Sequence, residues 1–146
     1  MKLIEATIQD VPMLLEIEKT VRGLKIYSGC FTKQEIEEWL GNDIVFLIEN
    51  DDLIVGSLSY EIKDKNHAHI SGFVIKPKFQ KQGFAKQALK LLFQKLNNFR
   101  KLSLDVHPDN HIVGLYESLG FKRESLVENY YGDGEPRLVM VKNNAV

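Results

Sequence analysis

The hydrophobic pattern changes its period at Pro77, and this change restricts the fold more than any other feature of the sequence. Before Pro77, three runs rich in β-branched and aromatic residues alternate with polar turns, which is typical of a meander of strands. These runs are residues 44–48, 53–62 and 67–75. After Pro77, apolar residues recur at helical spacing up to Leu96, and residues 102–106 alternate again as a strand. A helical crossover of this length permits the strands at 67–75 and 102–106 to be parallel, so we expect a mixed sheet.

Further helices and strands are expected on both sides of this region. Asp10 is placed to cap a helix with an apolar stripe, and Thr32 with Glu35 forms a capping box that opens a second helix. Gly120 is a suitable residue to end a short helix. The expected ranges are a first strand at 3–9, the short helix at 111–118, a strand from Phe121 and a last strand at 137–142. We therefore expect one α/β domain over residues 1–146, with helices on both faces of the sheet.

Composition narrows the class of protein. The chain has 146 residues and one cysteine, Cys30, which cannot form an internal disulfide and favours a reducing cytoplasm. Glu5 and Asp10 interrupt the apolar region that a signal peptide requires, and no apolar run approaches the roughly 20 residues needed to cross a bilayer. No set of ligands has the spacing of a metal site. We expect a cytoplasmic protein without a metal and without membrane contact.

The net charge of −1 conceals a strongly basic segment. Residues 76–101 contain eight lysines and arginines and no acid, while the rest of the chain carries 11 basic and 20 acidic residues. Such a segment can be a solvated helix face, or it can attract an anion. Nucleic-acid binding would require aromatic stacking platforms or a groove-reading helix, whereas these lysines surround the start of a helix at Gly83. We therefore expect a small anion as the ligand and no nucleic acid.

The loop before this helix has the parts of an anion site. A strand ends at Ile75, a short basic loop follows, and a helix begins at Gly83 with a second small residue at Ala85. The amides of a first helical turn lack internal partners, the helix dipole favours negative charge there, and glycine lets a phosphate approach the backbone. The sequence contains neither a P-loop nor the three-glycine dinucleotide motif.

Two motifs resemble one known family. Gln80-x-x-Gly83-x-Ala85 is similar to the Gln/Arg-x-x-Gly-x-Gly/Ala signature of the GNAT superfamily of acyl-CoA-dependent N-acetyltransferases. Downstream, the stretch from Asn110 to Phe121 resembles the family's Asn…Leu-Tyr-Glu-x-Leu-Gly-Phe. Residues 104–106, 116–121 and 128–131 look like the branch of ribosomal-protein alanine N-acetyltransferases. The resemblance implies a mostly antiparallel central sheet with one splayed parallel strand pair.

The resemblance also implies where acetyl-CoA binds. In the family, the cofactor lies between two central parallel strands, its pyrophosphate on the amides of the loop and helix start, and its pantetheine arm on the preceding strand. The loop residues implied here are Gln80, Lys81, Gln82, Gly83, Phe84, Ala85 and Lys86. The strand residues are Phe73, Val74 and Ile75, and backbone N–H groups near Val74 would also stabilise the oxyanion.

Three side chains carry the expected chemistry by the same resemblance. Asn110 matches the asparagine that contacts the cofactor arm, and Tyr116 matches the tyrosine that protonates the departing thiolate. Asn110 lies six residues before Tyr116 instead of the usual seven, so the loop after Pro108 must absorb about 100° of helical rotation. Asp105 takes the place of the branch's glutamate base and, being shorter, would act through water. Glu61 and His69 are further candidates for the base.

We therefore expect an N-acetyltransferase that moves an acetyl group from acetyl-CoA to a primary amine by direct attack in a ternary complex. The acceptor is a protein or peptide N-terminus or, alternatively, a small amine such as a polyamine, an aminoglycoside or an amino acid. A non-catalytic acyl-CoA-binding regulator is a second alternative, and a homodimer stays open. Acceptor choice is expected to depend on loops 22–34 and 128–136, where Tyr130 and Tyr131 line a groove or anchor the last hairpin.

Overall fold

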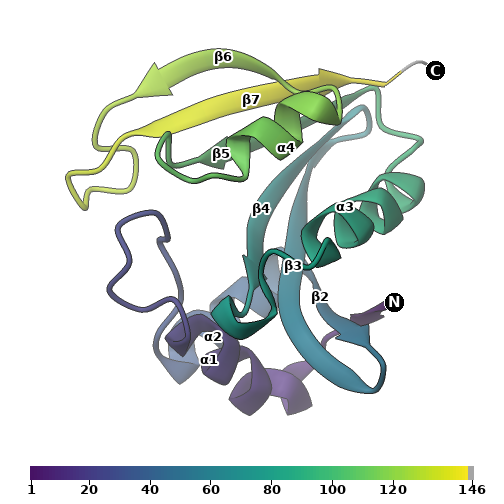
Figure 1. The fold of residues 1–146 in the computed structure, drawn as a ribbon, viewed down its shortest axis with the longest axis vertical. Helices are drawn as coiled ribbons and strands as arrows, with labels where there is room; N and C mark the ends of the chain where they lie inside the picture. Colours follow the sequence, from purple (N-terminus) through teal and green to yellow (C-terminus); the bar gives the residue numbers. More distant parts are fainter. Residues whose placement is uncertain (145–146) are drawn as a thin grey trace.

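A seven-stranded mixed sheet forms the centre of the protein, as Figure 1 shows for the computed structural model, which describes residues 1–144. The spatial order is β1-β2-β3-β4-β5-β7-β6, and every neighbouring pair is antiparallel except β4 and β5. The strands are β1 (Lys2–Glu5), β2 (Ile44–Asn50), β3 (Leu53–Asp64), β4 (His67–Ile75), β5 (Lys101–Val106), β6 (Lys122–Val127) and β7 (Arg137–Asn143). The parallel pair predicted from the change of period at Pro77 is confirmed.

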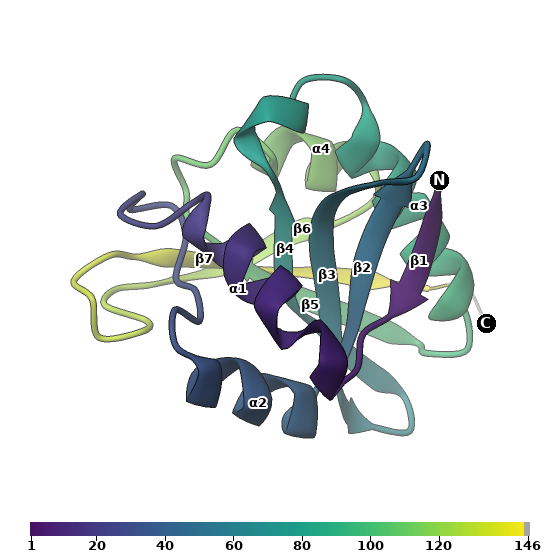
Figure 2. The same cartoon turned by 90° about the horizontal axis from the view of Figure 1, so that it is seen from below.

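Helices cover both faces of the sheet, as predicted (Figure 2). The helices are α1 (Val11–Lys19), α2 (Lys33–Asn42), α3 (Phe84–Lys95) and α4 (Val113–Ser118), with short 3-10 turns η1 (Ile8–Asp10) and η2 (Pro77–Phe79). Alternation along β2 shows why two layers are needed. Phe46 and Ile48 belong to the cluster under α3 and α4, whereas Val45 and Leu47 belong to the cluster under α1 and α2. A strand that is buried on both faces requires cover on both faces.

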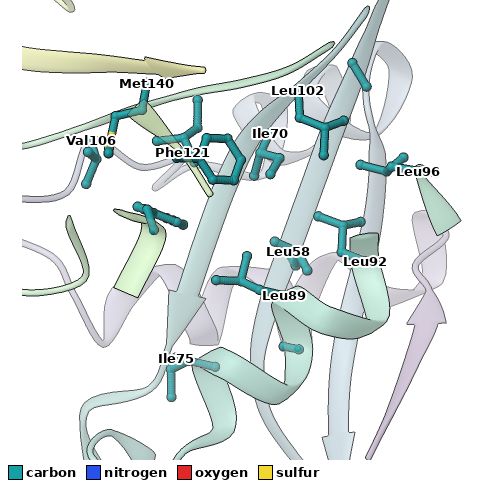
Figure 3. Packing of buried hydrophobic residues seen from close by; sticks show 14 of the residues in the cluster. Leu58, Ile70, Ile75, Leu89, Leu92, Leu96, Leu102, Val106, Phe121 and Met140 are labelled. Atoms are coloured by element: carbon teal, nitrogen blue, oxygen red, sulfur yellow. The ribbon is translucent and has the colours of Figure 1, made fainter. Parts of the chain in front are cut away.

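The helix α3 is held to the sheet by leucines at helical spacing. Leu89, Leu92 and Leu96 are fully buried, and Figure 3 shows them facing Leu58 and Leu102 of the sheet. Truncating one such leucine to alanine costs about 2–5 kcal/mol, because a cavity remains where the side chain was. This packing fixes the start of α3, and therefore the loop that precedes it, relative to β4.

Two predicted boundaries are wrong, and both for local reasons. The predicted strand 3–9 ends at Glu5, because Thr7 and Asp10 form a capping box that starts η1 and leaves Ile8 61% exposed. Asp10 does stand at the N-cap position of α1, but its carboxylate accepts from the Thr7 backbone instead. The predicted helix 111–118 begins only at Val113. The capping box of Thr32 and the end of α4 at Gly120, with its positive φ, are confirmed.

The parallel strands part halfway along their length. The register between β4 and β5 runs from His67↔Lys101 to Ile70↔Leu104 and stops there. At this point β4 has a bulge against β3, because Ser59 pairs with Gly72 and Tyr60 with Ile70, which leaves Ser71 as the extra residue. A bulge bends its strand and ends regular pairing. Beyond Ser71, β4 stays with β3, and β5 stays with β7.

None of the helices in residues 1–144 combines the length and the apolar character that a membrane span requires.

Candidate active site

A cavity of about 520 Å³ opens where β4 and β5 part. Its walls are the second half of β4, the end of β5, the start of α3, the segment before and through α4, and the connection between α1 and α2. Of the thirteen residues predicted for the site, twelve line this cavity. They are Phe73, Val74, Ile75, Gln80, Lys81, Gly83, Phe84, Ala85, Lys86, Asp105, Asn110 and Tyr116. The fold therefore brings together residues that lie more than 40 positions apart.

The loop at one end of the cavity presents backbone amides. Gly83 is the N-cap of α3 with φ of 83°, and Lys81 also has a positive φ of 63°. The first helical hydrogen bond runs from the Gln87 amide to the Gly83 carbonyl, so the amides of residues 82–86 lie outside the helical ladder. Gln82, the thirteenth predicted residue, turns its side chain away and donates to the Lys78 carbonyl. Only its main chain is available for the predicted role.

Two hydrogen bonds fix the end of β4, one to this loop and one to β3. Gln80 Nε2 donates to the Ile75 carbonyl at 2.9 Å, and the Lys76 amide donates to the Val55 carbonyl at 2.9 Å. On the side that faces β5, the backbone of β4 from Ser71 onward has no strand partner among residues 1–144. These groups are available to an extended ligand lying in the cavity.

Tyr116 of α4 is a buried phenol with no hydrogen bond to its hydroxyl among the described residues. Its ring makes an edge contact with Phe121, 5.7 Å between centroids. Burial raises the pKa of Tyr116 well above its usual value, and the charges of Tyr27 and Asp105 act in the same direction. The hydroxyl therefore keeps its proton at neutral pH, as a proton donor must.

Asn110 reaches the cavity from the turn before α4. Its amide donates to the His107 carbonyl at 3.0 Å, and its side-chain Oδ1 accepts from the Ile112 amide at 3.1 Å. This turn delays the helix to Val113, so Asn110 and Tyr116 do not share one helix face. The side-chain NH₂ of Asn110 is left to donate, and its contact with the cofactor arm stays a prediction.

Asp105 is held at both carboxylate oxygens. His69 Nε2 lies 3.1 Å from Oδ1, and the Tyr131 hydroxyl donates to Oδ2. His69 Nδ1 in turn lies 2.7 Å from Ser103 Oγ, which also contacts His67 Nε2 at 2.7 Å. Because a carboxylate only accepts, this network places the proton of neutral His69 on Nε2 and lets Ser103 donate to Nδ1. Burial, the largest cause, and nearby Lys101 lower the pKa of His67, which favours the neutral form of this side chain.

The other two candidates for the base differ in their positions. His69 is a hydrogen-bond partner of Asp105 and does not itself line the cavity. Glu61 pairs with Lys63 at 3.3 Å and does not line the cavity. Tyr131, for which sequence left two roles open, lines the cavity and contacts Asp105.

The sequence model of the acetyltransferase (GNAT) family matches residues 14–121, a range that contains the loop, both parting strands and Tyr116. The chain belongs to this family. Among curated proteins, it is 32% identical over 124 residues to the [Ribosomal protein bS18]-alanine N-acetyltransferase of Haemophilus influenzae, covering 84% of this chain and 82% of that one. The enzyme of the same name from Haemophilus ducreyi is 29% identical over 84% of this chain and 83% of its own.

Solved structures agree on the fold. The crystal structure of the ribosomal-protein alanine N-acetyltransferase from Escherichia coli superposes with a TM-score of 0.82 at 21% identity, over 99% of this chain and 94% of that one. A GNAT family acetyltransferase from Elizabethkingia anophelis, crystallised with acetyl-CoA bound, gives a TM-score of 0.76 at 18% identity, over 97% of both chains.

This GNAT protein is an acetyl-CoA-dependent N-acetyltransferase. Its cavity suits that co-substrate in three respects. The amides around Gly83 suit a diphosphate. The free edge of β4 suits an extended chain of amides, and Lys81 and Lys86 add positive charge at the same end.

Two parts of the acetyltransferase site were missed from sequence. One is a chain of donors in which Trp39 Nε1 donates to Ser59 Oγ at 3.1 Å, Ser59 contacts Ser71 at 2.8 Å, and Ser71 donates to Asp43 at 2.5 Å. The other is Glu18 of α1, whose pKa burial raises to about 7. Glu18 lies four residues after Leu14 on the buried stripe of α1, and a carboxylate in that position was the available signal.

Proposed function

We propose that this acetyltransferase acetylates the α-amine at the N-terminus of a protein or peptide. The observation that carries the proposal is the position of Asp105, a carboxylate fixed at both oxygens in the same cavity as the protonated Tyr116. Asp43 adds a further carboxyl group to this cavity, which favours a cationic acceptor. The names of the curated relatives, which specify an alanine of a ribosomal protein, point to the same class of acceptor.

The amine must lose a proton before it attacks. An α-amine has a pKa of about 8 and a lysine side chain about 10.4, so deprotonating the lysine costs about 3 kcal/mol more at the same pH. Each carboxylate oxygen of Asp105 has a second lone pair beyond the bond it already accepts, so Asp105 can receive this proton. His69, itself fixed by Ser103, holds the carboxylate in place. A single carboxylate base therefore suits an α-amine better than a lysine side chain, which is harder to deprotonate.

Acetyl-CoA supplies the acetyl group on a thioester, and the protein's remaining tasks are positioning and protonation. The loop amides of residues 82–86 hold the diphosphate, and the free edge of β4 aligns the arm. The backbone N–H groups near Val74 stabilise the oxyanion, and Tyr116 donates its proton to the departing sulfur. The single cysteine and an acceptor of the ribosomal class both support a cytoplasmic location.

The test is acetyl transfer to a matched pair of peptides, followed by mass spectrometry. One peptide has a free N-terminal alanine and no lysine. The other has the same sequence with its N-terminus formylated and one internal lysine. We expect acetylation of the first peptide and at least a tenfold lower rate for the second, in line with the difference in amine pKa. Acetylation of the lysine alone, or of polyamines and aminoglycosides in preference to the free N-terminus, would contradict the proposal.

A further inference from the structure

Arg137 is a buried cation whose hydrogen-bonding capacity is not used up. It begins β7 and its side chain is 2% exposed. Nη1 donates to the Pro136 carbonyl at 3.0 Å, but Nη2 makes no hydrogen bond within residues 1–144. The nearest carboxylate, Asp133 Oδ2, lies 3.6 Å from Nη2, which is an ion-pair contact beyond hydrogen-bond length. A buried donor without an acceptor is costly, more so on a charged group, so Nη2 needs an oxygen partner.

The side chain is part of the acetyltransferase cavity. Arg137 is among its lining residues, and the β5–β7 register, Asp105↔Val139 and Val106↔Leu138, puts Arg137 on the same face of the sheet as Asp105. Tyr131 links the two charged residues. The guanidinium lies 5.3 Å from the centre of the Tyr131 ring, and the hydroxyl of that ring donates to Asp105. A cation and an anion thus flank one aromatic side chain in the cavity.

We propose that Arg137 Nη2 binds the carbonyl or carboxylate oxygen adjacent to the acceptor's amine. The ligand class is an α-aminoacyl group, which has an amine for Asp105 and, three bonds from the amine nitrogen, an oxygen for the guanidinium. The inference rests on the proposed function, in which the acceptor amine lies at Asp105. Amines without such an oxygen leave Nη2 unsatisfied, and a site built around a hydrogen bond discriminates strongly against an analogue that lacks the group.

A second role for Arg137 would be to hold the loop between β6 and β7, through Pro136, Asp133 and the ring of Tyr131. The two roles predict different results. Loss of a loop anchor lowers the use of every acceptor in the same proportion. Loss of a ligand for oxygen lowers only the use of acceptors that carry the oxygen.

The experiment compares three acceptors of similar shape: L-alaninamide, L-alanine and isopropylamine, which lacks the carbonyl group. Each is measured with the wild-type enzyme and with Arg137→Met, which keeps an unbranched apolar side chain. Because each acceptor is compared with itself, its own amine pKa cancels. We expect kcat/KM for L-alaninamide to fall roughly 10- to 100-fold in the variant while that for isopropylamine stays within twofold. A larger loss of kcat/KM for L-alanine than for L-alaninamide would identify a free carboxylate as the ligand. A larger loss for L-alaninamide would identify a peptide carbonyl.

Two controls separate folding from recognition. Arg123→Met removes an exposed arginine that pairs with Glu117, outside the cavity, and should leave all three values unchanged. Asp133→Asn removes the 3.6 Å carboxylate and leaves Nη2 in place, so the preference for L-alaninamide over isopropylamine should persist. If Arg137→Met melts too early to assay, Arg137→Lys keeps the charge without the planar donors and should show the same selective loss.

Dissociation constants from NMR titration of the CoA-loaded enzyme give a readout that does not depend on turnover. Arg137→Met should weaken L-alaninamide selectively here as well. An equal loss for all acceptors, or no loss, would overturn the inference. If the wild-type enzyme acetylated no free N-terminus but still bound L-alaninamide through Arg137, the proposed function would fail and the oxygen subsite would stand.

Discussion

Replacing Tyr116 by phenylalanine separates its chemistry from its packing. The hydroxyl makes no hydrogen bond within the described residues, so its removal leaves no buried partner unsatisfied. The ring and its edge contact with Phe121 remain. We therefore expect the free energy of unfolding to change by less than about 1 kcal/mol. If the phenol protonates the leaving thiolate, kcat should fall by about 10²–10⁴, equivalent to roughly 3–5 kcal/mol of barrier.

The assay is thiol release from acetyl-CoA at saturating acceptor, together with a thermal melt. The KM for acetyl-CoA should stay within about threefold, because the loop and β4 bind the co-substrate through main-chain groups. Tyr60→Phe is a matched control, since that tyrosine is partly buried against the core and does not line the cavity. Because burial raises the pKa of Tyr116, its hydroxyl should stay protonated up to pH 9. The wild-type rate should therefore show no decrease from loss of this proton as the pH is raised to 9. A Tyr116→Phe enzyme with a wild-type melting temperature and kcat within threefold of normal would refute the assignment.

Three further changes test other parts of the reasoning. Burial raises the pKa of Glu18 in the folded protein to about 7, so its contribution to the free energy of unfolding is complete only below about pH 4.5, and roughly 3 kcal/mol of it should be lost as the pH rises through 7. The urea midpoints at pH 5 and pH 8 should therefore differ less in Glu18→Gln than in the wild-type protein. Gly56→Ala should destabilise by about 2 kcal/mol or more because its Cβ would overlap the Val74 carbonyl, whereas Gly114→Ala, with open space around it, should be neutral or stabilising; equal denaturation curves would contradict this. Asp105→Asn should lower transfer at pH 7 by roughly 10²-fold, with a smaller loss at pH 9, where the acceptor amine deprotonates unaided; a pH-independent loss would argue against a base.

Local rules were sufficient for the parts of the site that depend on the backbone. The loop at Gly83 could be predicted because a helix that starts at a glycine, with lysines and no acid nearby, presents free amides in a positive field. The positive φ of Gly83 agrees with that interpretation. The parallel strand pair followed from one change of hydrophobic period. The error at residues 3–9 has the same local origin, since alternation predicted a strand and the capping box of Thr7 and Asp10 ended it.

Side chains that depend on distant loops could not be predicted. Arg137 alternates along β7 like any exposed residue, and it is buried only because the loop carrying Tyr131 and Asp133 folds over it. Glu18 is enclosed by the segment around Cys30, whose backbone partly offsets the rise in the pKa of Glu18 that burial causes. Neither loop conformation can be derived from local propensity. The part of the cavity around Asp105 and Arg137, where we propose that the acceptor binds, is therefore the part that could be predicted least from the sequence.

The bulge at Ser71 has a mechanical consequence. Within residues 1–144, the strand pairing between the leaf formed by β1 to β4 and the leaf formed by β5 to β7 is limited to four residue pairs, from His67↔Lys101 to Ile70↔Leu104. Because this pairing is confined to one end, the two leaves diverge toward the other end, where the cavity opens. Residues such as Ala68 and Leu102, which do not line the cavity, belong to the pairs that join the two leaves and so help to set the width of the cavity between them.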